Sequence, residues 1–282
     1  MKPPQHRWQY GHVRGCPLSP IDWVRTLLMH IRVRMWGGIS ADALVDRARA
    51  GDFIGMSGRG VFAWGQEITS NSRISHVGVV CVSRGVKCIA HATPHADGLP
   101  NHNPGAGAVR VTPLRDFIET YLDSAGLDLC LRRLHGVDDR ARDADGLTHR
   151  DRVNAAVLAT AAERAHLPFT AAPNTFLTVR YPVFGALLAA AVAAAVALGV
   201  GAPRRLVETA HRSIYCSEFV TLAYMAAGVF RADACDTQFR YAPGDFTAAA
   251  TPVRSALDLG PGEGHLPFAD MRYHFGAEEW IN

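Results

Sequence analysis

Two runs rich in β-branched residues follow one another closely in the chain. They read ISHVGVVCV at 74–82 and VKCIAHAT at 86–93, and only the tripeptide at 83–85 separates them. Short strands joined by so few residues, one of them a glycine, are typical of a β-hairpin. The sequence therefore predicts an antiparallel sheet that includes this hairpin.

A two-residue turn would fix which residues of the hairpin face each other. With Ser83 paired to Val86, His91 falls opposite Gly78, and His76 becomes its diagonal neighbour on the same face. The glycine opposite His91 would leave open space beside the two rings. We therefore expect His76 and His91 to lie close together.

Helical patterns surround the hairpin. A basic amphipathic stretch at 21–36 and a short helix at 40–49 precede it. After it, we expect strands at 108–113 and 128–134, a helix near 117–125, a surface loop at 136–150, and helices at 151–166 and 217–229. Helices, then antiparallel strands, then helices again predict the α+β fold class.

The composition is that of a folded globular protein. Of the 282 residues, 48% are hydrophobic and 20% are charged, and the net charge is +3. Apart from Lys2 and Lys87, the basic residues are arginines, and no basic run is interleaved with aromatic residues. A nucleic-acid partner is therefore not expected. The six cysteines lie far apart and the N-terminal sequence has no apolar export signal, so we expect free thiols and a cytoplasmic location.

Cys216 stands at a predicted helix start in the stretch IYCSEFV. Ser213 and Ser217 are suitable capping residues, and the apolar face of the helix begins at Phe219. The amides and the dipole at a helix N-terminus stabilise a thiolate, lower the pKa of the thiol and can bind an oxyanion. Cys216 is therefore a candidate nucleophile, with a buried structural cysteine as the alternative.

Four segments together resemble the circularly permuted NlpC-type papain-fold hydrolases. They are GDFIG at 51–55, EITSNSRISHVGVV at 67–80, the strand end IAHAT, and YCSEFV. That group includes YiiX-like bacterial proteins, a poxviral relative and, more distantly, the lecithin:retinol acyltransferases. In the permuted group, as in this chain, the histidine strand precedes the cysteine helix. The resemblance implies a permuted papain-like fold, in which an antiparallel sheet packs against the helix that bears the nucleophilic cysteine.

The resemblance also implies a role for each matching residue. Cys216 would be the nucleophile, His76 the general base, and His91 the residue that orients His76, where many relatives carry a carboxylate. Tyr215 and Ser217 would line the site and its oxyanion hole. No metal or organic cofactor is implied.

The proposed pair constrains an apolar segment that is long enough to span a membrane. Residues 183–202 carry no polar side chain and lie between His76 and Cys216, so a single span would separate the two across a bilayer. We therefore expect a buried or hairpin-like helical insertion, with peripheral membrane contact as the alternative. The expected parts are a helical extension at 1–50, a catalytic domain at 51–250, and a C-terminal tail at 251–282. Asp52 is expected to be structural.

A zinc site is a competing interpretation, because Cys81, Cys88, His91 and His95 lie close in sequence. Their spacing, with a proline inside HATPH, does not match structural zinc motifs. We expect Cys81 and Cys88 to contact different partners across the hairpin and to be small core residues.

The expected activity is cleavage of a peptide or isopeptide-like amide bond by Cys216 through an acyl-enzyme. The first alternative is a lipid-directed acyltransferase or phospholipase of the same fold, whose substrate would be a lipid ester. The second is a non-catalytic binding or scaffold protein. The substrate and the oligomeric state stay open.

Overall fold

The computed structural model describes part of the predicted catalytic domain and of its flanks. The described residues are 38–58, 74–93, 98–103, 105, 107–124, 126–169, 213–231, 243–246, 266, 268–270 and 272–281. The predicted helix at 21–36 and the apolar segment at 183–202 lie outside them. None of the helices in the described part is long and apolar enough to cross a membrane.

An antiparallel sheet of six strands forms the centre of the fold. Its spatial order is β4-β3-β2-β1-β5-β8, and β6 and β7 form a second, two-stranded sheet. The strands are β1 (Phe53–Gly58), β2 (His76–Ser83), β3 (Val86–Ala92), β4 (Val109–Pro113), β5 (Gly126–Arg132), β6 (Leu134–His135), β7 (His274–Phe275) and β8 (Glu279–Trp280).

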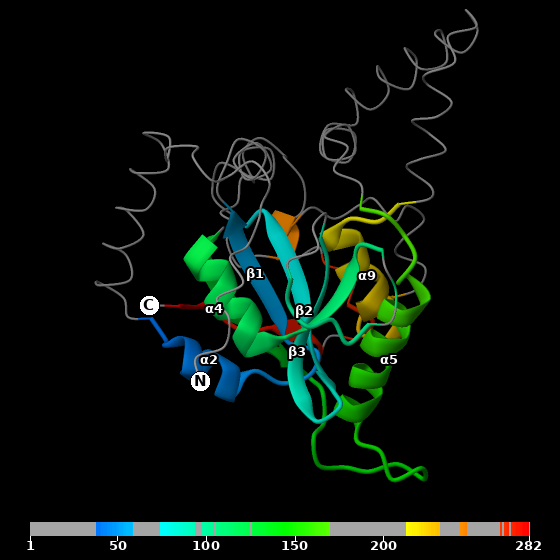
Figure 1. Ribbon diagram of the computed structural model, residues 1–282. Helices are drawn as coiled ribbons and strands as arrows, with labels where there is room; N and C mark the ends of the chain where they lie inside the picture. Colours follow the sequence, from blue (N-terminus) through cyan, green and yellow to red (C-terminus); the bar gives the residue numbers. More distant parts are fainter. Residues whose placement is uncertain are drawn as a thin grey trace, which may run out of the picture.

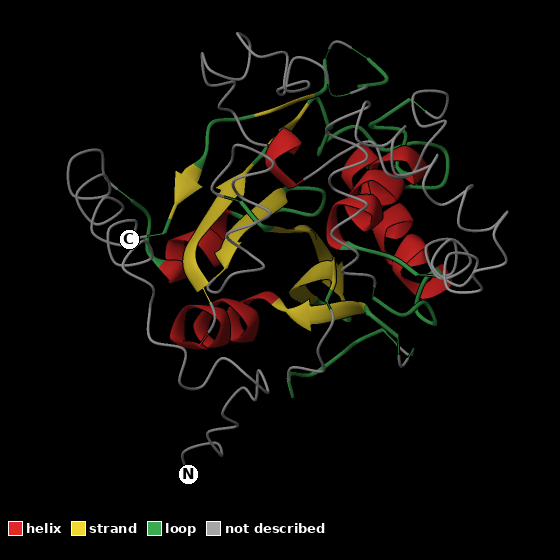
Figure 2. Cartoon of the chain, turned by 90° about the horizontal axis from the view of Figure 1, so that it is seen from above, coloured by secondary structure: helices red, strands yellow, loops and turns green. Residues whose placement is uncertain are grey.

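Helices cover both faces of the large sheet (Figures 1 and 2). The helices α2 (Ala41–Arg47) and α4 (Leu114–Ser124) pack on one face, where their apolar side chains form one core with Ile54 and Val80. The helices α5 (His149–Glu163) and α9 (Cys216–Ala226) pack on the other face and against each other. This arrangement confirms the predicted α+β class.

The β2–β3 hairpin has the predicted register. Ser83 pairs with Val86 and Gly78 pairs with His91. The turn residues Arg84 and Gly85 have φ angles of 55° and 77°. Two successive positive φ angles are the mark of a type I′ turn, whose twist matches that of the flanking strands. The turn therefore fixes the alignment that brings His76 and His91 together.

The C-terminal segment differs from the expected irregular tail. Glu279 and Trp280 form β8 and pair with β5 at the edge of the large sheet, and β7 pairs with β6. The strand β1 was also not predicted, and it lies in the middle of the sheet between β2 and β5. The strand β8 is too short, and β1 too rich in glycine, to show a clear alternation of apolar and polar residues in the sequence.

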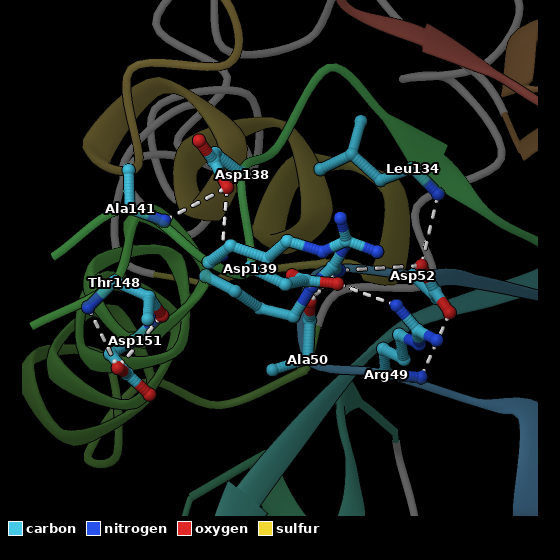
Figure 3. A network of polar contacts seen from close by, with 11 residues as sticks. Arg49, Ala50, Asp52, Leu134, Asp138, Asp139, Ala141, Thr148 and Asp151 are labelled. Carbon is cyan, nitrogen blue, oxygen red and sulfur yellow. Dashed lines mark hydrogen bonds and ion pairs between the residues drawn. The ribbon is translucent and has the colours of Figure 1, made fainter.

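Asp52 closes the turn in front of β1 (Figure 3). Its buried carboxylate accepts hydrogen bonds from the backbone amides of Arg49 (2.8 Å) and Leu134 (2.9 Å). Arg150 lies 3.8 Å from it and also pairs with Asp139. Burial raises the pKa of Asp52 to about 6. Its contacts join the start of β1 to β6, which agrees with the structural role expected for it.

Arg132 fastens later parts of the chain to the sheet. Its side chain on β5 is buried and donates hydrogen bonds to the carbonyl groups of Phe246, Phe275 and Gly276. The guanidinium also lies 5.4 Å from the centre of the Phe275 ring. A buried charge is tolerated only where several such bonds replace its hydration shell. Arg132 therefore holds η2 (Pro243–Phe246) and the strand β7 in place.

We predict that Gly51→Ala destabilises the protein by about 3 kcal/mol, the sum of left-handed strain and steric overlap. Gly51 has a φ of +90°, and an added Cβ would lie 2.8 Å from Val153 Cγ1. Urea unfolding measures the change in the free energy of unfolding.

The matched control is Gly85→Ala, at a φ of +77° with nothing within 4 Å of the added Cβ. It should cost about 1 kcal/mol, because only the strain remains. Equal losses for the two variants would contradict the steric contribution of Val153. In a Val153→Ala background, the loss caused by Gly51→Ala should be smaller, because the overlap with Cγ1 is removed.

Candidate active site

Cys216 is the first residue of α9, as the sequence predicts. Tyr215 is the N-cap residue, in extended conformation, so neither Ser213 nor Ser217 caps this helix. The backbone amide of Tyr215 donates to Glu218 Oε2 at 3.4 Å. The apolar face of α9, which includes Phe219, packs against β2 and thereby holds the helix N-terminus at the sheet.

The thiol of Cys216 is buried beside the start of β2. Backbone hydrogen bonds from Val77, Ser217 and Cys216 itself act on the sulfur and favour the thiolate. Burial is the larger effect, however, and it raises the pKa of Cys216 to about 12. The expected lowering of this pKa is therefore wrong for the resting protein, because desolvation outweighs the helix N-terminus. The thiol is protonated at neutral pH.

The two predicted histidines form a hydrogen bond with each other. His76 Nε2 lies 3.0 Å from His91 Nδ1, and the ring centroids are 5.3 Å apart. His91 is 1% exposed, and its ring stands edge to face with Phe117 of α4 at 5.0 Å. The ring of His76 is half-buried. His91, held by Phe117, thus fixes the orientation of the more accessible ring.

The space opposite His91 is filled rather than open. A Cβ at Gly78 would lie 2.7 Å from both Cδ1 and Cγ1 of Ile89. The glycine at this position is therefore needed because the Ile89 side chain lies across the strand, and the expected open space beside the rings is absent from this described part of the sheet.

Both histidines are neutral in the resting protein at pH 7. Burial lowers the pKa of His76 to about 4. The pKa of His91 is also lowered, first by burial and then by the nearby His76 and Arg110. A neutral imidazole has one protonated and one unprotonated nitrogen, so the pair can pass a proton along its hydrogen bond.

Cys216 and the imidazole pair are both close to the start of β2 but lie on different faces of the sheet, because His91 packs on Phe117 of α4 whereas Cys216 belongs to the core beneath α5 and α9. The backbone amide that acts on the Cys216 sulfur belongs to Val77, the residue after His76. Among the hydrogen bonds of the described residues, none joins the thiol directly to the His76 ring. Since Nε2 of His76 is used by His91, Nδ1 is the nitrogen that would serve the thiol.

The two expected site-lining residues are buried. Tyr215 is 2% exposed and Ser217 is fully buried, and within the described part Ser217 Oγ has no hydrogen-bond partner. Their roles stay predictions. Glu218, two residues after the cysteine, is a buried carboxylate that was not among the predicted site residues, and burial raises its pKa to about 7. Its position three residues after the N-cap, where Glu is typical of a capping box, is the pattern from which it could have been predicted.

The described part of the chain contains no arrangement of ligands that would support the competing zinc interpretation. Cys81 and Cys88 lie directly opposite each other, so the expectation of different partners is wrong, although both are core residues as predicted. His91 packs on Phe117 of α4, whereas Cys81 and Cys88 belong to the core on the other face of the sheet. His95 lies outside the described residues. Among the described residues, no three His, Cys, Asp or Glu side chains are placed to hold a metal ion.

Comparison with known proteins finds a solved structure that is similar in fold. No family model matches the chain, and no curated protein matches it in sequence. A solved structure, the metalloprotein YiiX from Escherichia coli O157:H7, is similar over 64% of this chain and 67% of its own, with 16% identity and a TM-score of 0.36. YiiX is thus a structural neighbour, and a similarity of this size carries no information about the site.

We predict that His76 and His91 make the folded protein less stable in acid. Because the folded-state pKa of His76, about 4, lies below the ordinary value of 6.5, the unfolded chain binds more protons between these values. The free energy of unfolding should therefore fall as the pH decreases from about 6.5 to about 4. Urea unfolding at a series of pH values measures the slope.

The variant His76→Asn should flatten this slope, whereas His166→Asn, which changes an exposed histidine, should leave it as it is. A slope that His76→Asn does not alter would contradict the neutral state of the His76 ring.

Proposed function

We propose that the protein is a cysteine hydrolase of permuted papain-like, NlpC-type fold that cleaves a peptide or isopeptide-like amide bond. The observation that carries the proposal is the bond of 3.0 Å between His76 and His91 at the start of β2, the strand whose Val77 amide bonds the Cys216 sulfur. A nucleophile, a base and a group that orients the base are the three parts of a thiol hydrolase site. The order of these residues in the chain adds support, because the histidines precede the cysteine.

The reaction would begin from a neutral pair. As Cys216 Sγ attacks the carbonyl carbon, its proton passes to Nδ1 of His76, and the electron pair of the carbonyl double bond moves to the oxygen. His91 Nδ1 accepts the hydrogen bond from Nε2 of the resulting imidazolium. His76 then returns the proton to the departing amine, which leaves a thioester at Cys216.

Water completes the cycle by the reverse sequence. His76 takes a proton from the attacking water, the oxygen adds to the thioester carbon, and the Cys216 sulfur leaves and regains a proton. In both halves the negative charge on the carbonyl oxygen needs donors. The amides of Cys216 and Ser217 at the start of α9 are suitable donors, since they already act on the neighbouring sulfur. The Tyr215 amide is used by Glu218.

The resting state makes the nucleophile dependent on its base. A thiol with a pKa of about 12 is almost fully protonated at neutral pH, so it reacts fast only if His76 removes its proton during attack. This distinguishes Cys216 from Cys130, which is equally buried on β5 and whose pKa burial raises well above the usual value. The rate at which a cysteine reacts should therefore depend on a neighbouring histidine rather than on the exposure of its sulfur.

We predict that a haloacetamide probe labels Cys216 faster than the other cysteines near neutral pH. His76→Ala should lower this rate by at least about tenfold, because general-base assistance is worth that much or more. Peptide mapping by mass spectrometry identifies the labelled residue. Cys130→Ala is the matched control and should label at the unaltered rate.

Equally slow labelling of all cysteines would contradict the proposal. Amide-linked and lipid-ester substrates, each incubated with the unaltered chain and with Cys216→Ala, test the bond that is cleaved. Loss of amide cleavage in the variant supports the proposal, and loss of lipid cleavage instead would replace it with the lipid-directed activity. If neither substrate gives a product that depends on Cys216, the remaining alternative is a non-catalytic binding protein.

A further inference from the structure

A cationic side chain lies next to His91 on the neighbouring strand. Arg110 of β4 is the residue directly opposite His91 of β3. Residues directly opposite in an antiparallel pair project on the same face of a sheet, with Cβ atoms about 5 Å apart. Arg110 Nη2 donates to the carbonyl of Leu99 at 3.0 Å, which anchors the guanidinium on this edge of the sheet. Arg110 thus stands on the far side of His91 from His76.

The surroundings of His91 are otherwise apolar. The titratable and charged groups that face it in the described part are His76 on β2 and Arg110 on β4, while α4 presents the ring of Phe117. His91 Nε2 is buried and has no hydrogen-bond partner among the described residues. No carboxylate of the described part acts on this ring. A second proton on His91 would therefore find a cation nearby and no compensating anion.

The two rings differ in this respect. Burial lowers the pKa of both rings, and the charge of Arg110 adds to this effect at His91. A fixed positive charge disfavours a second positive charge in proportion to its proximity. Arg110 therefore acts more strongly on His91, which is its cross-strand partner, than on His76, which lies one strand further away.

We propose that Arg110 is a positioning residue of the site, a guanidinium that keeps the proton shared by the two imidazoles on His76 and away from His91. The inference rests on the proposed function for its importance to the reaction, since the proton taken from Cys216 must stay on His76 to reach the leaving group. His91 would then act as a neutral hydrogen-bond acceptor throughout. Arg110 contacts no reacting atom and works through His91.

The location of the proton can be measured directly in the unaltered protein. Nitrogen-15 NMR of the histidine rings, assigned with His76→Asn and His91→Asn, shows which ring becomes an imidazolium as the pH is lowered. We expect the first proton on His76. Protonation of His91 before His76 in the folded protein would overturn the proposal, and this measurement requires no change at Arg110.

Variants at position 110 test the cause. Arg110→Gln should raise the midpoint of the His91 titration by about one pH unit, the size expected when a charge next to a buried ring is lost. Arg110→Lys, which keeps the charge, should restore most of the original midpoint. Arg115→Gln, which removes an exposed arginine at the start of α4, is the matched control and should change neither ring.

A folded Arg110→Gln protein with an unchanged His91 midpoint would overturn the proposal, as would an Arg110→Lys protein that behaves like Arg110→Gln. The ring titrations can be repeated in Cys216→Ala, where no hydrolysis occurs. Failure of the proposed hydrolase activity therefore shows in the labelling and cleavage experiments, and failure of the Arg110 proposal shows in the ring titrations.

Discussion

The two-residue turn between β2 and β3 is the constraint on which the candidate site depends. Arg84 and Gly85 adopt positive φ angles and thereby set the pairing of Ser83 with Val86. Because side chains alternate between the faces of a strand, a slip of one residue would turn His76 and His91 to opposite faces. The contact between the two imidazoles is therefore specified by a turn that lies at the far end of both strands.

The site is also shaped by how deeply the fold buries it. The helix terminus, the strand start and the Phe117 ring exclude water from Cys216 and His91, and each loses its charged form as a result. The amides around the sulfur oppose this effect without reversing it. In the proposed hydrolase, catalysis would depend on moving a proton between two neutral groups when substrate is present, rather than on a thiolate that already exists.

The sequence predicted the parts of the fold that local patterns control. The hairpin and the start of α9 follow from strand composition, a glycine-containing turn and the first residues of an apolar helix face. The pKa of Cys216 could not be predicted, because it depends on packing against β2 from far along the chain. Arg110 was missed for a similar reason, since its place opposite His91 is set by a pairing across an irregular connection. The short strand β8 depends on contacts with β5 that its own sequence does not indicate.

The protonated state of Cys216 has a further consequence for the chemical durability of the protein. Peroxides oxidise thiolates, and a thiol with a raised pKa in a water-poor setting is a poor substrate for them. Enzymes that keep a permanent thiolate accept the risk of conversion to sulfinic and sulfonic acids between turnovers. Under the proposed function, the sulfur would become oxidisable only while a substrate draws its proton onto His76, so an idle molecule would outlast an active one under oxidative stress.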